Sequence, residues 1–444
     1  MKNYVFLWFL LFNMLNLLVL IKSPLNEENK FIEEMIKIKD KYPYVYINVG
    51  EKENVPLYIS LYTPHILLFP KDNNSIRYDY TTSKTYVDKN ITTEMSHPQN
   101  PKAKIKIRIS SETFKYENNN YNFTFSIIDG QKKAGPDNVG GVYGILRDVD
   151  KFENITKDVL LIEQLFKKNL IKKKLFYISN FFDGDNSLNQ AKLLIGKIPE
   201  EFDGENKKKL PFCSFDDTFS KNYYDCKLGG FIFEETNNNI SYSIKIDERK
   251  TIIGRFEEGN IQQHQMPLSL FPEFKKYFID KKGCKLTENK DSIICEEEST
   301  RNIKISFVFN GYKFILNKES TWHGKEINFV FNQEQDTIIL LSAFLGNYHR
   351  IYDLEDKKMY FSSVQNNIIK INDNSSDNGK KPDDNNTKTI WIIVGSIGGV
   401  IVIGVILFVI ITVTKKKNKS YIDEVQKVSF INDEDRENNE KIIS

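Results

Sequence analysis

The chain has 444 residues, a formal net charge of +2 and 40% hydrophobic residues, so it can bury a large core in more than one lobe. Acidic residues are interleaved with the lysines, and no basic stripe with regular aromatic residues occurs, which argues against a nucleic-acid partner. The metal-binding patterns CxxC and HExxH are absent, and GxGxxG and P-loop patterns are missing from the residues before the apolar run near the C-terminus. We therefore expect neither a metal site nor a cofactor.

Residues 1–23, MKNYVFLWFLLFNMLNLLVLIKS, place one lysine ahead of a long apolar stretch. This pattern is typical of a secretory signal peptide, and a first transmembrane anchor is the alternative. A secretory route brings the residues that follow into an oxidising compartment, where cysteines can pair. We expect a folded ectodomain over residues 24–364.

Between residues 43 and 361 the apolar segments are short, rich in Ile, Phe, Tyr and Val, and separated by Asn, Asp, Gly and Lys. Such spacing predicts a mostly β fold with few short helices. The two clearest helical patterns are DVLLIEQLFKKNLI at residues 158–171 and LSLFPEFKKYF at residues 268–278, where apolar side chains recur at roughly helical intervals.

The ectodomain contains four cysteines, for which three pairings are possible. Neighbours in sequence are the expected pairs, Cys213 with Cys226 and Cys284 with Cys295. Seven Asn-x-Ser/Thr sequons fit a glycosylated ectodomain, although an Asn-rich chain also produces such triplets by chance. The sequons are at Asn73, Asn90, Asn122, Asn154, Asn239, Asn374 and Asn385.

The C-terminal part has the pattern of a membrane anchor. Residues 365–388 are polar and predict a flexible stalk, and residues 389–414 contain an uncharged run long enough for a transmembrane helix. Lysines begin the tail at residues 415–444, which places it in the cytosol. We expect a single-pass type I membrane protein with an extracellular or luminal ectodomain. Gly395 and Gly399 can pair two spans, or they belong to a Gly-rich span without a partner.

Taken in chain order, the ectodomain segments resemble the pepsin-like aspartic peptidase family, the eukaryotic aspartyl proteases. YVYINVGEKENVPLYISLYTPHILLFP is similar to the first hairpin of that family, which continues into D-T-G-S-x-x-L-W-V-P. GILRDVD is similar to D-G-I-L-G-L-G, IKISFVFNGYKFIL to the F-x-F-x-G strand, and TIILLSAFLGNYHRIYD to the closing segment. The resemblance implies a bilobal fold, with an N-lobe at about residues 43–205 and a C-lobe at about residues 206–364.

The family hydrolyses peptides with two carboxylates that share a proton and hold a water molecule. Counting nine residues back from the proline that ends each motif places these two positions at Leu61, before Pro70, and at Glu258, before Pro267. Glu257 is one residue away from the second position. A leucine cannot act as an acid or base, so the resemblance predicts that the catalytic pair is lost and assigns no catalytic residue.

Two further family features differ in this sequence. The glycine that follows two apolar residues in each crossing strand is replaced, after Ile145-Leu146 by Arg147 and after Ile339-Leu340 by Leu341. The flap pattern Y-G-x-G-S is absent from the residues around His97, where its position falls by length. These losses predict a family scaffold without peptidase chemistry.

The expected function is that of a membrane-anchored pseudoprotease, which binds a peptide or protein ligand in its interlobe cleft without cutting it. An active aspartic-type endopeptidase with a non-standard catalytic pair is the alternative, and an unrelated β-rich adhesin is a third reading. Fold does not determine function, so this expectation depends on the family resemblance.

Overall fold

The structure is a computed structural model of the chain, and it describes residues 30–371. Short gaps in this range are residues 40–41, 72–75, 98–99, 117–118, 130–138, 150–154, 181, 184–185, 188–189, 219–220, 236–239, 247–250, 258–262, 290, 297–301, 324, 334–335 and 364–365. The predicted signal peptide, stalk, transmembrane span and cytoplasmic tail lie outside the described residues. Within the described residues, no helix has the length and apolar character needed to cross a bilayer.

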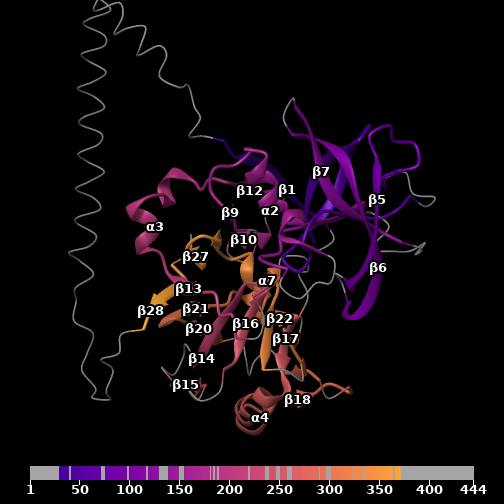
Figure 1. Cartoon of the computed structure of the whole chain (residues 1–444). Coiled ribbons are helices and arrows are strands. Elements are labelled where there is room, and N and C mark those ends of the chain that lie inside the picture. Colours follow the sequence, from indigo (N-terminus) through magenta and orange to yellow (C-terminus); the bar gives the residue numbers. More distant parts are fainter. Residues whose placement is uncertain are drawn as a thin grey trace, which may run out of the picture. The chain divides into compact units, whose positions relative to one another are not determined.

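The described chain is mostly β, as predicted (Figure 1). The largest sheet has 13 strands, and it takes most of them from the first half of the chain. In chain order they are β1 (Ile32–Lys39), β2 (Tyr42–Val49), β3 (Lys52–Ser60), β4 (Leu67–Leu68), β5 (Val87–His97), β6 (Asn100–Tyr116), β7 (Asn119–Ile128), β8 (Gly141–Gly144), β9 (Leu175–Ile178), β12 (Gln190–Ile195), β13 (Phe212–Ser214), β26 (His349–Asp353) and β27 (Lys358–Ser362).

A second sheet of nine strands is built only from the second half of the chain. Its members are β14 (Asp225–Glu235), β15 (Ile240–Lys245), β16 (Ile253–Phe256), β17 (His264–Pro267), β20 (Ile303–Phe309), β21 (Tyr312–Ile315), β24 (Phe329–Gln333), β25 (Thr337–Leu340) and β28 (Ile368–Lys370). Two small sheets pair β10 (Phe182–Asp183) with β11 (Asn186–Ser187), and β18 (Lys285–Leu286) with β19 (Ile293–Ile294), β23 (Glu326–Ile327) and β22 (Trp322–His323).

The helices are short, and the two predicted ones form where the sequence placed them. The helices of the described residues are α2 (Leu161–Lys167), α3 (Glu205–Lys209), α4 (Phe271–Lys275), α6 (Lys318–Thr321) and α7 (Ser342–Leu345), and the two predicted ones are α2 and α4. Three-residue 3-10 turns precede α2 and α4, and a π-helical turn over Lys276–Lys281 extends α4. Helix α2 buries Leu161, Ile162 and Leu165, so its apolar face holds it against the core.

The same strand arrangement occurs once in each large sheet. In the first sheet, β3 runs parallel to β8, and β4 pairs antiparallel with β8. In the second sheet, β16 runs parallel to β25, and β17 pairs antiparallel with β25. Ser60 lies opposite Gly144, and Phe256 lies opposite Leu340. Strands β3 and β16 therefore end at corresponding points, and each is followed by a turn.

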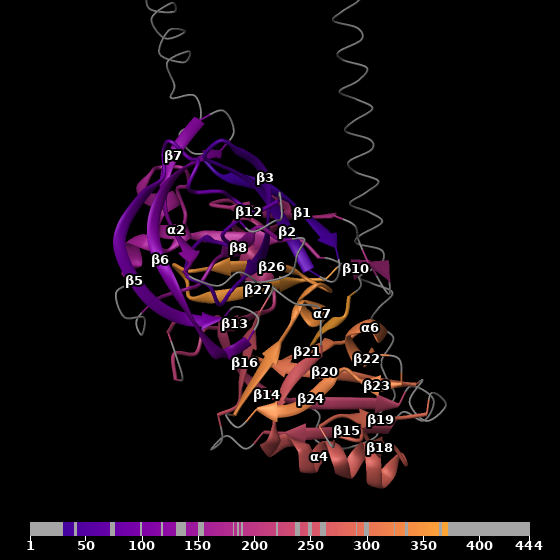
Figure 2. The same ribbon diagram turned by 90° about the vertical axis from the view of Figure 1, so that its right-hand side faces the viewer.

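The two halves of the described chain are joined by shared sheet and core. Strands β26 and β27 from the C-terminal end pair with β9 and β13 in the first sheet (Figure 2). One apolar cluster contains buried side chains from both halves, among them Leu61, Tyr143, Phe256, Leu340 and Phe344. Because this cluster is continuous, the turns that follow β3 and β16 are held in a common packed environment.

Both predicted disulfides are present, Cys213–Cys226 and Cys284–Cys295. The first joins β13 of the large sheet to β14 of the second sheet, so it links the two halves near the point where the chain passes between them. Of the seven sequons, Asn90 and Asn122 are described, and both residues are exposed. The remaining sequon asparagines, Asn73, Asn154, Asn239, Asn374 and Asn385, lie outside the described residues.

Candidate functional site

The turns that follow β3 and β16 meet through two buried polar side chains. The hydroxyl of Ser60 donates a hydrogen bond to Oε2 of Glu257, with 3.5 Å between the two oxygens. The residues are 197 positions apart in sequence, and their exposed fractions are 1% and 5%. The repeated strand arrangement thus brings one hydroxyl and one carboxyl group together between the halves.

The first turn fixes the orientation of the Ser60 hydroxyl. The backbone N–H of Tyr62 donates to Ser60 Oγ at 3.1 Å, and the hydroxyl of Thr63 donates to the same oxygen at 3.4 Å. A serine hydroxyl has two lone pairs and one proton. Both lone pairs are occupied by these donors, so the proton is directed to Glu257.

Strand β8 continues across the first turn and holds its backbone. The N–H of Ile145 donates to the carbonyl of Ser60 at 2.8 Å, and the N–H of Leu146 donates to the carbonyl of Thr63 at 3.0 Å. In the second half, the N–H of Glu257 donates to the carbonyl of Leu340 at 2.9 Å. Each turn is therefore supported by the strand that runs parallel to the one preceding it.

The two positions counted from the sequence lie next to the residues that meet. Leu61 is fully buried in the apolar core, and Glu258 lies outside the described residues. Ser60 and Glu257 each precede the proline of their motif, Pro70 or Pro267, by ten positions, not nine. By strand register, however, Ser60 corresponds to Phe256 and Leu61 corresponds to Glu257, so Ser60 meets Glu257 from one position earlier in its turn.

Gly144 precedes Ile145-Leu146 in the crossing strand and lies at a close approach of two backbones, while the replacement of the family glycine by Arg147 stays a prediction. A Cβ atom at Gly144 would lie 2.4 Å from the carbonyl oxygens of both Thr63 and His65, so only glycine permits this approach of two backbones. Leu340 occupies the corresponding register position in the second half, so the two halves differ at this point.

A buried ion pair with two tyrosine rings borders the site. Nε and Nη2 of Arg255 donate to the two carboxylate oxygens of Asp225, at 2.8 and 2.6 Å. The guanidinium carbon of Arg255 lies 4.1 Å from the ring centre of Tyr223, and the rings of Tyr62 and Tyr223 meet edge to face with centroids 5.2 Å apart. Tyr62, whose backbone N–H bonds to Ser60, connects this network with the first turn.

Burial governs the titration of these neighbours. Burial raises the pKa of Asp225, and its hydrogen bonds with Arg255 oppose that increase. Burial also raises the pKa of the Tyr62 hydroxyl well above its usual value. Tyr62 therefore stays neutral at any physiological pH and cannot supply an anion to the site.

No histidine activates Ser60 among the described residues. Nε2 of His65, in the same turn, lies 2.5 Å from the hydroxyl of Ser126 in β7, and Nδ1 of His264 accepts a hydrogen bond from the N–H of Leu341 at 3.3 Å. A nucleophilic serine needs an adjacent base that can take its proton. The pair of Ser60 and Glu257 does not form the serine–histidine arrangement of a hydrolase.

The segment around His97 forms the closing end of a long hairpin. His97 ends β5 and pairs with Asn100, the first residue of β6. The strands β5 and β6 therefore form a β-hairpin at the position where the flap sequence was expected from the family.

Over the part of residues 30–371 that the structure describes, no group of three or more His, Cys, Asp or Glu side chains has the arrangement needed to hold a metal ion. No protein-family model and no curated protein matches the chain.

Proposed function

We propose that the ectodomain is a bilobal, pepsin-like scaffold that belongs to an inactive relative of the aspartic peptidases. Two observations support this proposal. The order of the sequence motifs follows the family over most of the ectodomain, and the arrangement of β3, β4 and β8 is repeated by β16, β17 and β25. A repeated arrangement of this kind is expected of a two-lobed fold with one catalytic turn in each lobe.

The contact between Ser60 and Glu257 carries the functional proposal. It lies where the two turns meet, and it holds one carboxyl group instead of two. Aspartic peptidases need one group to take a proton from water while the other protonates the scissile carbonyl. A serine hydroxyl cannot replace a carboxyl group in this exchange, because its pKa is far too high. We infer that the site does not hydrolyse peptides.

We propose that the protein binds a peptide or protein ligand without cutting it, as a single-pass type I membrane protein that displays its ectodomain outside the cytosol. The organised polar centre supports a binding role, since Ser60 keeps all three of its hydrogen bonds and Arg255 keeps its buried partner.

One observation favours the alternative of an active endopeptidase. Glu257 is a buried acid located where one catalytic carboxyl group would be required. In this alternative, Glu257 would act with a second acid from the undescribed residues, for which Glu258 is the candidate from the sequence.

An activity assay on the full-length chain in detergent separates the two functions. The protein is incubated with a mixed peptide library from acidic to neutral pH, with and without a transition-state inhibitor of aspartic peptidases. We expect no inhibitor-sensitive cleavage, together with retention of a subset of the peptides on the immobilised protein. Inhibitor-sensitive cleavage that is lost in Glu257→Gln or Glu258→Gln would show the active enzyme instead.

A further inference from the structure

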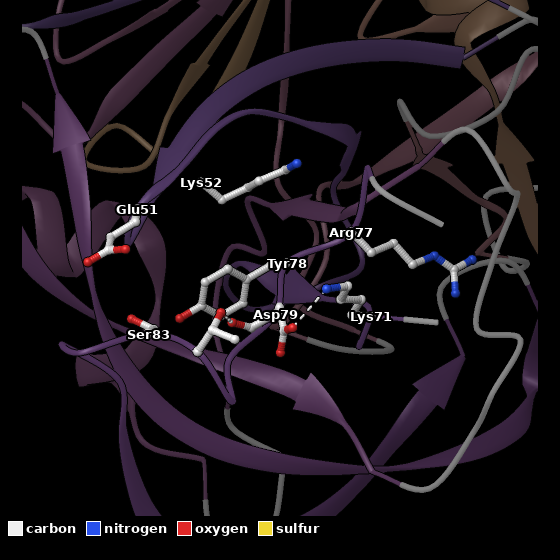
Figure 3. Close-up of a pocket in the computed structure, with 8 residues that line it drawn as sticks. Glu51, Lys52, Lys71, Arg77, Tyr78, Asp79 and Ser83 are labelled. Carbon is white, nitrogen blue, oxygen red and sulfur yellow. Dashed lines mark hydrogen bonds and ion pairs between the residues drawn. The ribbon is translucent and has the colours of Figure 1, made fainter. Parts of the chain in front are cut away.

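A pocket of about 320 Å³ lies away from the Ser60–Glu257 contact, beside the turn between β2 and β3. Glu51 of that turn and Lys52, the first residue of β3, line the pocket together with Lys71, Tyr78 and further residues of the segment up to residue 83. Figure 3 shows the Tyr78 ring beside Asp79 and below Lys52. The volume falls in the range of small-molecule sites, about 300–1,000 Å³.

The wall of the pocket is anchored by a buried acid. Glu112 is fully buried, and its carboxylate accepts hydrogen bonds from the hydroxyl groups of Tyr78, Ser83 and Thr85. The bond from Ser83 is 2.6 Å long. Gly50 in the β2–β3 turn has a φ of +57°, and a Cβ atom there would lie 3.1 Å from Ser83 Oγ. The turn and the segment around Tyr78 are therefore held closely together, so the pocket is preformed.

Each acid that lines the pocket is already paired with a lysine. Nζ of Lys71 lies 3.0 Å from Oδ2 of Asp79, and Nζ of Lys84 lies 3.3 Å from Oε1 of Glu51. The hydrogen bonds from Thr81 and Lys71 lower the pKa of Asp79, so it is ionised at neutral pH. Lys52 adds a further positive charge to the lining.

Two lysines of the lining come from different segments, Lys52 from β3 and Lys71 from the segment after β4. Figure 3 shows Lys52 and Lys71 extending above and beside Tyr78, whereas the guanidinium group of Arg77 is directed away from them. An ammonium group has three N–H donors. Lys71 is half exposed, so its single ion pair leaves donors available to a ligand.

The hydroxyl groups of the lining can act as hydrogen-bond acceptors for a ligand, whereas the lysines act as donors. Ser83 donates its proton to Glu112, and Thr82 donates its proton to the carbonyl of Asp79 at 3.1 Å. The Ser83 oxygen also accepts a hydrogen bond from the N–H of Thr85 at 3.3 Å, which leaves it one lone pair. The oxygens of Thr82 and Ser83 can therefore accept from a ligand, and the ligand must supply the donors. A ligand that fits has a compact anion for the lysines and hydroxyl groups for Thr82 and Ser83.

We propose that this pocket binds a small polyhydroxylated compound that carries a phosphate monoester, with the phosphate between Lys52 and Lys71. Phosphate accepts several charge-assisted hydrogen bonds from ammonium groups, and the sugar hydroxyls donate to Thr82 and Ser83. A soluble sugar phosphate and the phosphorylated inositol headgroup of a lipid share this chemistry.

Calorimetric titration of the full-length chain in detergent tests the site with glucose 6-phosphate, and with glucose as the uncharged probe. We expect glucose 6-phosphate to bind and glucose to give no signal. Lys52→Met and Lys71→Met should each weaken the affinity by about tenfold or more, as expected for a lost charge-assisted contact. Lys71→Arg keeps the charge and should stay close to wild type.

Lys192→Met is the matched control. Lys192 is 54% exposed and pairs with Glu33 at 3.0 Å, whereas Lys71 is 50% exposed and pairs with Asp79 at the same distance. The control removes an equivalent lysine outside the pocket, so its affinity should equal that of wild type. Thermal unfolding of each variant shows whether the fold is kept.

Flotation with vesicles of phosphatidylcholine, with and without phosphatidylinositol 4-phosphate, identifies the source. If the phosphorylated vesicles bind more protein and Lys52→Met abolishes this extra binding, the ligand is a lipid headgroup. If there is no extra binding to these vesicles but glucose 6-phosphate binds, the ligand is a soluble compound. The proposal is overturned if neither glucose 6-phosphate nor the phosphorylated vesicles bind. It is also overturned if glucose binds equally well, or if the Lys52 and Lys71 variants bind like Lys192→Met.

Discussion

Replacing Ser60 by Asp tests the central contact of the candidate site. The new carboxylate would stand where a hydroxyl now lies 3.5 Å from Oε2 of Glu257, and both side chains are buried. Two unit charges at that separation repel by about 5 kcal/mol at an effective dielectric constant of about 20. The pair can avoid this cost by taking up a proton, so one carboxyl pKa in the folded variant must rise.

The sign of the pH dependence follows from that increase. The unfolded Asp has a pKa near 3.9, so at pH 7 the proton uptake costs at most about 4 kcal/mol, at 1.36 kcal/mol per pH unit. Near pH 3.5 the carboxyl groups are largely protonated in both states, and the cost disappears. We expect Ser60→Asp to be about 3–4 kcal/mol less stable than Ser60→Asn at pH 7, and about equally stable near pH 3.5.

Denaturant unfolding of both full-length variants, followed by circular dichroism in detergent, measures the difference. Asn matches Asp in shape and cannot ionise, so their comparison removes the effect of added volume. If the two variants were equally stable at both pH values, the side chain of residue 60 would not face the carboxyl group of Glu257. The inference of a lost catalytic pair would then have no structural basis.

Three further variants test the surroundings of the site, each by denaturant unfolding. Gly144→Ala should destabilise the fold by a few kcal/mol, because its Cβ would lie 2.4 Å from two carbonyl oxygens. Gly229→Ala is the control and should cost less, because the closest contact of its Cβ is 3.3 Å. Equal losses of stability in the two variants would contradict the close approach. Arg255→Met should cost about 3–5 kcal/mol by leaving the buried carboxylate of Asp225 unpaired, and adding Asp225→Asn should recover part of that loss; no recovery would speak against the ion pair. Burial lowers the pKa of His65 to about 3, so below pH 6.5 the unfolded chain binds a proton that the folded chain does not, and stability falls as the pH drops from about 6.5 towards 3. His65→Phe should show a shallower fall between pH 7 and pH 4, and an unchanged slope would mean that His65 titrates normally.

Features that depend on local patterns could be predicted from the sequence. Short β-rich segments between turn residues predicted the mostly β fold, and apolar residues at helical spacing predicted α2 and the turns around α4. Cysteines close in sequence predicted the disulfides, because short loops bring their ends together at low entropic cost. Each of these features is set by residues within about a dozen positions of one another.

The residues that meet at the candidate site were decided by tertiary structure. Ser60 and Glu257 are brought together by two strand arrangements far apart in the sequence, and each lies one position before the residue counted from the sequence, Leu61 or Glu258. The need for glycine at position 144 depends on Thr63 and His65, whose carbonyl oxygens are placed beside it by the tertiary structure. The direction of a side chain in a turn depends on how the strands before and after the turn are paired. That pairing is set by strand register between segments far apart in the sequence, which local sequence patterns do not determine.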